Sequence, residues 1–232
     1  MKKLLYIVAL LLFQSFFFSG TVAAKALDEY SVKAAFIYNF CKFSRWAPLP
    51  ATEQQPFDFT IGVVGKNPFN DQLLPLTEEN VHQRPIKLIY LPKSASSKQL
   101  RQCQVLFIDV DSAKERCAIL KKVHDIAVLT ISDHKGFSQQ GGCIEFSTQK
   151  KTIRFILNRA AIEQQHIEMS YKVYSLAVKV LEAGDVKDSI QQFINSSQNE
   201  RHYPAGLYGD SRPDQCLLFC SSKPYIAARN PH

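Results

Sequence analysis

Three adjacent residues, Ser132, Asp133 and His134, have the side-chain types of a hydrolase triad. In such a triad the histidine reaches the serine hydroxyl while a carboxylate orients the imidazole from its far side. Residues that follow one another along the chain cannot take up those positions with each other. Lys135 and Gly136 come next, and this composition after an apolar stretch is typical of a turn. We therefore interpret the tripeptide as a turn and predict no catalytic residues.

Other signatures of catalysis or cofactor binding do not occur in the sequence. Gly62 and Gly65 lack the spacing of a dinucleotide-binding or phosphate-binding loop, so they indicate a strand end and a turn. No His-Glu-x-x-His or Gly-x-Ser-x-Gly pattern is present. We accordingly expect no cofactor and no metal, and a protein that acts by binding and is not an enzyme.

Three residues are candidates for binding a small anion or other ligand. Arg84 precedes a predicted strand, and His166 and Glu168 lie in the connection between the last two predicted helices. Loops at the edge of an α/β sheet often line a ligand crevice. The alternative interpretation is that all three are ordinary solvated surface residues.

The first 24 residues have the pattern of a secretory signal peptide. Two lysines precede an apolar run over 4–18, and small residues up to Ala24 suit cleavage before Lys25. We therefore expect a periplasmic protein. All six cysteines lie beyond this segment, and an even number in an oxidising compartment favours disulfides over metal. Sequence does not choose their pairing, so all six are disulfide candidates: Cys41, Cys103, Cys117, Cys143, Cys216 and Cys220.

The chain is basic, but its charge is dispersed. It has 28 Lys and Arg against 21 Asp and Glu, which gives a formal net charge of +7. A nucleic-acid surface would show clustered basic residues with aromatic residues between them. The only tight pairs after the leader are Lys121-Lys122 and Lys150-Lys151. Nucleic acid is therefore not an expected partner.

Apolar strands alternate with helical patterns along the middle of the chain, which predicts a mostly parallel sheet covered on both faces. We expect strands at 57–64, 85–91, 103–110 and 126–132, and helices at 69–76, 94–102 and 112–123. An antiparallel hairpin then follows, because 141–147 and 152–157 alternate on either side of a short polar link. Helices at 158–165 and 170–183 complete an α/β domain over 25–190. Residues 191–232 lack a period and are expected to form a polar, partly disordered tail.

The most aromatic segment is a predicted helix that starts near Ser31 and ends at Trp46. Its apolar residues cover most of its circumference, so the helix must be buried or have two partners. It is too short to span a bilayer. We expect it to pack across the sheet and to leave one flank for a partner protein. The candidate contact surface comes from this helix and from the last one around Tyr171, Tyr174 and Val178, with these contact residues: Phe36, Phe40, Phe43, Trp46, Tyr171 and Tyr174.

An ordered series of segments resembles the YfiR-like family of periplasmic proteins. The series begins with the helix from Val32 that ends at Trp46 and Pro48, and continues with the strand at 59–65. It then includes the strand at 103–108, the strand at 128–133 and the paired glycines Gly141 and Gly142. The hairpin strand at 153–158 and the helix around 170–180 complete it, so the resemblance covers residues 28 to 183.

The resemblance implies a Rossmann-like α/β sandwich and a regulator. It implies repression of an inner-membrane diguanylate cyclase, or of another membrane sensor, through its periplasmic sensor region. It also implies release by an outer-membrane, peptidoglycan-associated lipoprotein, which raises cyclic di-GMP and favours biofilm. Disulfides matter in the family, but Cys41 and Cys143 depart from its pattern, so no pairing is transferred. A homodimer stays open, and a small-molecule-binding protein that serves a transporter or sensor is the alternative function.

Overall fold

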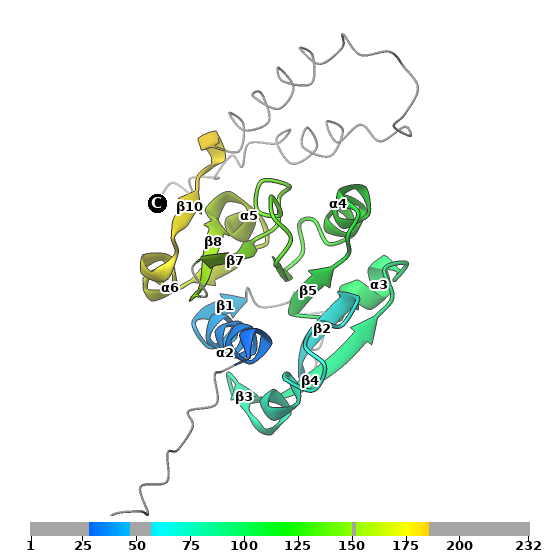
Figure 1. Cartoon of the computed structure of the whole chain (residues 1–232). Coiled ribbons are helices and arrows are strands. Elements are labelled where there is room, and N and C mark those ends of the chain that lie inside the picture. Colours follow the sequence, from blue (N-terminus) through cyan, green and yellow to red (C-terminus); the bar gives the residue numbers. More distant parts are fainter. Residues whose placement is uncertain (1–27, 47–56, 150–151, 186–232) are drawn as a thin grey trace, which may run out of the picture.

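The computed structural model describes residues 28–46, 57–149 and 152–185, and these form an eight-stranded mixed sheet with helices on both faces, plus a separate two-stranded sheet (Figure 1). The strand order of the large sheet is β10-β8-β7-β6-β5-β2-β4-β3. The predicted α/β fold with a mixed sheet is confirmed. The predicted signal peptide, Cys216, Cys220 and the predicted tail from 191 lie outside the described residues.

Five strands form the parallel part of the sheet, as their continuous apolar sequences predict. In spatial order they are β7 (Ile144–Gln149), β6 (Leu129–Ser132), β5 (Val105–Asp109), β2 (Phe59–Gly65) and β4 (Arg84–Leu91). The predicted hairpin is present, since β8 (Thr152–Asn158) runs antiparallel to β7. Short strands close the two edges: β10 (Lys179–Leu181) parallel to β8, and β3 (Asn80–Val81) antiparallel to β4.

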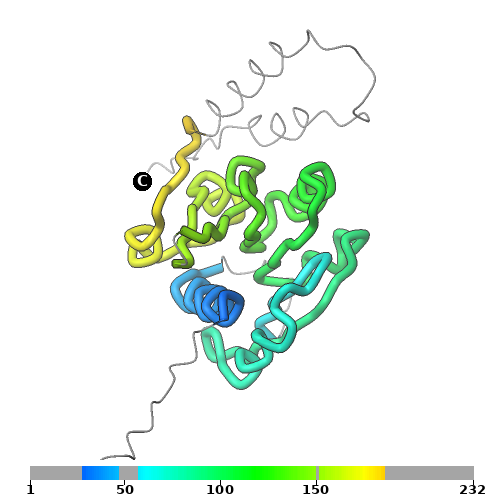
Figure 2. The backbone as a smooth tube through the Cα atoms, in the orientation of Figure 1, coloured from blue at the N-terminus to red at the C-terminus, as the bar shows by residue number. Residues whose placement is uncertain are grey.

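Alternate residues of each central strand face two separate hydrophobic cores. In β5, Val105 and Phe107 face one core, while Leu106 and Ile108 face the other. The first core is covered by α2 (Glu29–Lys42), with contributions from α5 (Arg159–Gln164) and α6 (Tyr171–Leu176). The second is covered by α3 (Ser97–Leu100) and α4 (Ala113–Lys122). Figure 2 shows the backbone of these layers. Side chains on both faces of the sheet are thus excluded from water, which is why the strands read as unbroken apolar runs.

Several predicted helices are shorter in the structure. The first helix ends at Lys42 and not at Trp46, because residues Ser44–Trp46 form β1, which pairs antiparallel with β9 (Ile167–Met169). The last helix ends at Leu176 and not at 183, because the Val178 amide donates to the carbonyl of Phe155 and the chain continues as β10. The predicted helix at 69–76 is a series of turns followed by the 3-10 helix η1 (Leu74–Glu78). No helix in the described ranges is long and apolar enough to cross a bilayer.

Candidate functional site

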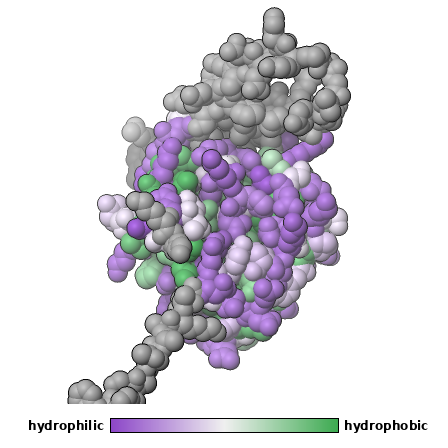
Figure 3. Space-filling model, viewed as in Figure 1, coloured by the Kyte–Doolittle hydropathy of each residue, from purple (hydrophilic) through white to green (hydrophobic). Residues whose placement is uncertain are grey.

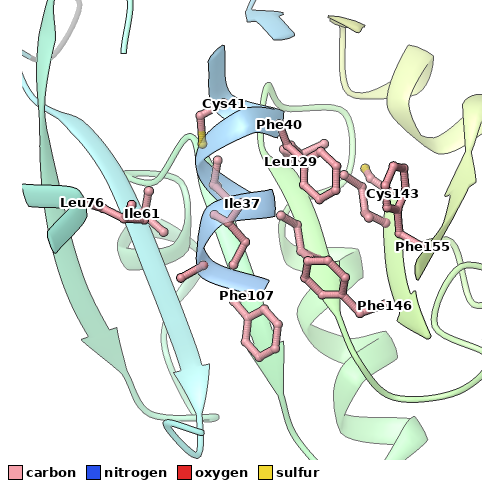
Figure 4. Packing of buried hydrophobic residues seen from close by; sticks show 14 of the residues in the cluster. Ile37, Phe40, Cys41, Ile61, Leu76, Phe107, Leu129, Cys143, Phe146 and Phe155 are labelled. Carbon is pink, nitrogen blue, oxygen red and sulfur yellow. The ribbon is translucent and has the colours of Figure 1, made fainter. Parts of the chain in front are cut away.

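Helix α2 provides the centre of the first core. Ile37 and Phe40 are buried, and the Phe40 ring lies edge-on to Phe155 with 4.9 Å between centroids. Figure 4 shows Phe40 pointing from α2 toward Phe155 and Cys143. Phe36 lies on the same side, partly buried, at 5.6 Å from Phe155. Phe40, predicted as a partner contact, is therefore a core residue, because α2 lies flat over the sheet and its inward face is enclosed.

A buried cation fixes the first half of α2. The Lys33 side chain is 3% exposed, and its Nζ lies 2.7 Å from Asp133 Oδ2 and 2.8 Å from Glu29 Oε1. The Tyr30 hydroxyl donates to the same Asp133 oxygen at 3.1 Å. Burial by itself lowers the pKa of Lys33, but the hydrogen bonds to Asp133 and Glu29 outweigh it and leave that pKa above its ordinary value. Lys33 is therefore charged, and it ties α2 to the end of β6.

Trp46 has a structural role in addition to its partial exposure. Its ring stands edge-on to Phe59 at 5.0 Å, and its Nε1 donates to the carbonyl of Gln104 at 3.2 Å. The residue lies on β1, opposite Ile167 of β9. The β1–β9 pairing thus brings the end of the aromatic helix beside the segment that leads into α6.

Exposed apolar side chains gather where α2, β1 and α6 meet. Their exposed fractions are 41% for Phe43, 80% for Tyr171, 64% for Leu176 and 45% for Val178, and we call these four residues the α6 face. The amide of Ser170 donates to the carbonyl of Phe43 at 2.8 Å, which joins the two segments. Figure 3 shows apolar surface gathered around α2 and α6. Such a cluster on a solvent-exposed surface is typical of an interaction site.

Four exposed cations lie within two residues along the chain of an α6-face residue: Lys42, Arg45, Lys172 and Lys179. The Lys172 ammonium lies 6.0 Å from the centre of the Phe43 ring, so a basic group borders the apolar surface directly. Tyr174, also predicted as a contact, is half-buried beneath the guanidinium of Arg159 at 4.8 Å. Burial raises the pKa of the Tyr174 phenol. A partner with apolar residues among acidic ones would complement this surface.

The predicted anion-binding residues do not form one site. The guanidinium of Arg84 donates to the carbonyl of Asp58 and lies over the Phe59 ring at 5.5 Å. His166 is exposed in the turn after α5, with a φ of 54°, and Glu168 is exposed on β9 opposite Arg45. Within the described residues no hydrogen bond or ion pair joins Arg84 to either of them. A hollow of about 400 Å³ lies over α3, and none of the three lines it.

The Ser132–His134 segment has the geometry of a turn. Ser132 is fully buried, and its hydroxyl donates to the carbonyl of Ile108 at 2.6 Å and accepts from the amide of His134. The His134 ring lies 3.0 Å from Asp109 and not against the serine. This agrees with the interpretation from sequence, because the serine hydroxyl is engaged by main-chain groups.

The cysteines divide into two groups. Cys41, Cys103 and Cys143, three of the six disulfide candidates, are free, buried thiols in the structure, so these three do not pair. They pack in the two hydrophobic cores, where a thiol is stable without a disulfide partner. Burial raises the pKa of Cys103 to about 12 and also raises the pKa of Cys41 and Cys143. Cys117 is buried on α4 and is disulfide-bonded, as its candidacy from sequence predicts.

One exposed residue of the α6 face was missed from sequence. Leu176 belongs to a stretch that was predicted as continuous helix to 183. In such a helix nothing would distinguish it from the other apolar residues. The structure ends α6 at this residue and leaves its side chain 64% exposed. A leucine at the end of a helix carries no sequence signal that separates a contact residue from a core residue.

A family model described as YfiR/HmsC-like matches residues 30–178. The chain belongs to the YfiR/HmsC-like family. The family consists of periplasmic, regulatory proteins of cyclic di-GMP signalling, and the resemblance stated from sequence is confirmed at that level. The match extends from Tyr30 on α2 to Val178 just before β10, so it includes every residue of the α6 face. A comparison with curated proteins found no match.

Proposed function

We propose that this YfiR/HmsC-like protein is a periplasmic repressor that holds an inner-membrane diguanylate cyclase inactive by binding its periplasmic sensor region. The α6 face is the proposed contact surface. It presents four large apolar side chains on a short helix and the adjoining strand ends, and exposed cations border it. Interfaces of regulatory complexes typically combine such an apolar centre with a polar rim.

The exposure of the α6 face is the observation that supports the proposal. Tyr171 and Leu176 are more than 60% exposed, although burying apolar surface stabilises a protein by about 25 cal/mol per Å². The same domain encloses apolar residues of similar size in two complete cores. A surface that stays uncovered beside such cores is available for a partner. Binding of an outer-membrane lipoprotein to the same face would compete with the cyclase and release it.

The proposal is tested in cells by matched pairs of substitutions. Deleting the gene raises cyclic di-GMP, and the wild-type gene restores the low level. Leu176→Asp and Tyr171→Asp fail to restore it, because each puts a carboxylate into the apolar contact. The controls are Leu74→Asp and Tyr90→Asp, which change the same residue types at 49% and 50% exposure, away from the α6 face. These controls restore repression.

Two results would contradict the proposal. Cyclic di-GMP that stays constant on deletion removes the cyclase as the client. Equal repression by the α6-face variants and by their controls, at equal periplasmic amounts judged by immunoblot, removes the contact surface. A ligand screen of the purified protein by thermal shift addresses the alternative, a small-molecule-binding protein, and we expect that screen to find no ligand at Arg84, His166 or Glu168.

A further inference from the structure

The parallel sheet changes its direction of growth between β2 and β5. From β2 the chain passes to β4 on one side, and then returns to form β5 on the other side of β2. Open α/β sheets bind ligands at such a switch point, in the crevice outside the carboxyl ends of the two strands. In this chain those ends are Gly65 and Asp109, which are paired neighbours in the sheet.

Three potential metal ligands meet at this point. One ligand atom from each of Asp109, Asp111 and His134 lies within 4.8 Å of the other two. Asp109 ends β5, Asp111 follows two residues later, and His134 follows the neighbouring strand β6. The His134 Nε2 is 3.0 Å from Asp109 Oδ1. In a tetrahedral zinc site with bonds of about 2.1 Å the ligand atoms lie about 3.4 Å apart, so side-chain movements of about 1.5 Å would bring all three onto one ion.

The nearby side chains leave this group accessible while fixing its backbone. Asp133, a third acidic residue nearby, is held by Lys33 and Tyr30 and is not part of the group. The buried guanidinium of Arg116 donates to the carbonyl of Asp111 at 2.7 Å. The turn that carries Asp111 is thus anchored through its backbone carbonyl, and this contact does not use the carboxylate oxygens that would bind a metal.

We infer that Asp109, Asp111 and His134 form a binding site for a divalent transition-metal ion such as Zn²⁺, with at least one coordination position open to water. One imidazole and two carboxylates are ligands that zinc accepts, and three protein ligands plus water are its usual arrangement in open sites. Calcium and magnesium are disfavoured because both prefer all-oxygen sites. On binding, His134 presents the Nε2 lone pair and carries its ring proton on Nδ1.

Sequence patterns could not predict this site, because its ligands come from two strands that only the fold brings together.

Lys66 competes with a metal ion for the carboxylate of Asp111. Its ammonium lies 2.7 Å from Asp111 Oδ2, and both side chains are about 70% exposed. Exposed ion pairs of this kind are weak, so a metal ion displaces the lysine from the carboxylate. Removing the lysine should therefore strengthen metal binding, which a merely structural role of the cluster would not produce.

The test is calorimetric titration of the full mature protein, under non-reducing conditions, with ZnCl₂ after treatment with chelator. We expect one site, with affinity lowered at least about 10-fold by His134→Asn and by Asp109→Asn. Lys66→Met should bind zinc more tightly than the wild type. The matched controls, His166→Asn and Asp71→Asn, replace exposed residues elsewhere and should leave the affinity unchanged.

Substitution with Co²⁺ identifies the ligand atoms and excludes a thiolate site made by cysteines. Nitrogen and oxygen ligands give only weak visible bands, whereas thiolates add an intense near-ultraviolet band. The inference is overturned if the wild type binds no zinc, if the spectrum shows thiolate ligation, or if His134→Asn binds like the wild type. Should His134→Asn fail to fold, Lys66→Met decides the matter, because an unchanged or weaker affinity in that exposed-residue variant contradicts the inference equally.

Discussion

Substituting one partner of the Lys33–Asp133 ion pair should be among the most destabilising single changes in the domain. Changing Asp133 to Asn leaves the Lys33 ammonium, whose side chain is 3% exposed, with Glu29 as its remaining carboxylate. Removing one partner of a buried pair typically costs about 3–5 kcal/mol, because the other charge stays buried without compensation. Glu29 retains part of that compensation, so we expect a loss near the lower limit, about 3 kcal/mol.

The reverse change should cost less. Lys33→Met keeps the apolar stem in the core and removes the charge. Asp133 is then left alone, but it is 17% exposed and accepts a hydrogen bond from Tyr30, so water can solvate it in part. We expect about 1–2 kcal/mol. The double variant removes both charges and should be more stable than Asp133→Asn, which gives a coupling energy of about 2–3 kcal/mol.

The assay is urea unfolding at pH 7, followed by fluorescence of Trp46. This residue is the only tryptophan in the chain and packs edge-on to Phe59 at 5.0 Å, so its emission reports the first core. A matched control exists within the same domain. Lys66 and Asp111 have the same residue types and the same 2.7 Å separation as Lys33 and Asp133, but are about 70% exposed. With chelator present, Asp111→Asn should leave the urea midpoint unchanged.

A loss below about 1 kcal/mol for Asp133→Asn would refute the reasoning, since it would mean that the Lys33 ammonium escapes to water. A double variant no more stable than Asp133→Asn would also refute it, because the penalty would then come from the aspartate position and not from an uncompensated charge. Equal effects of Asp133→Asn and Asp111→Asn would show that burial does not determine the strength of these pairs.

Two further predictions concern the cores. Phe40→Ala should lower the free energy of unfolding by about 3–5 kcal/mol, whereas Phe43→Ala, at 41% exposure, should stay within about 0.5 kcal/mol in the same urea assay; similar losses for the two would contradict the assignment of one to the core and one to the surface. Because burial raises the pKa of Cys103 from the ordinary 9.0 to about 12, with Cys41 and Cys143 also raised, the unfolded chain loses these protons first. The contribution of these thiols to stability should be constant below about pH 9 and fall above it by about 1.4 kcal/mol per pH unit for Cys103 alone. Iodoacetamide at pH 8 should modify these thiols only after urea is added, which mass spectrometry of the labelled peptides measures.

The strands and the hairpin could be predicted because their signals are local. Continuous apolar runs such as 103–110 indicate burial on both faces, and the alternation on either side of 150 indicates an antiparallel pair. Strands β1 and β9 have three residues each, too few to show a period, so their pairing had no sequence signal. That pairing shortened the first helix and brought Phe43 beside α6.

Which face of a helix is enclosed is a question of rotation about its axis, and sequence did not answer it for α2. Apolar residues cover most of the helix, so Phe40 and Phe43 were equal candidates for partner contact. The sheet encloses the first and leaves the second exposed. The same limit applies to the proposed metal ligands, since Asp109 and His134 become neighbours only through the pairing of β5 with β6.

The two ends of α2 therefore have different physical roles, and this separates stability from binding in experiments. Its first half is fixed by the Lys33 ion pair and its middle by Phe40, so changes there weaken the whole domain. Its last residues lead through β1 and β9 to α6, a helix of six residues that carries the exposed Tyr171 and Leu176. Short elements with few enclosed side chains are the least stable parts of a fold and can adapt to a partner. Substitutions at Leu176 should consequently change repression without changing the urea midpoint, whereas Asp133→Asn should change repression only in proportion to the folded protein it leaves.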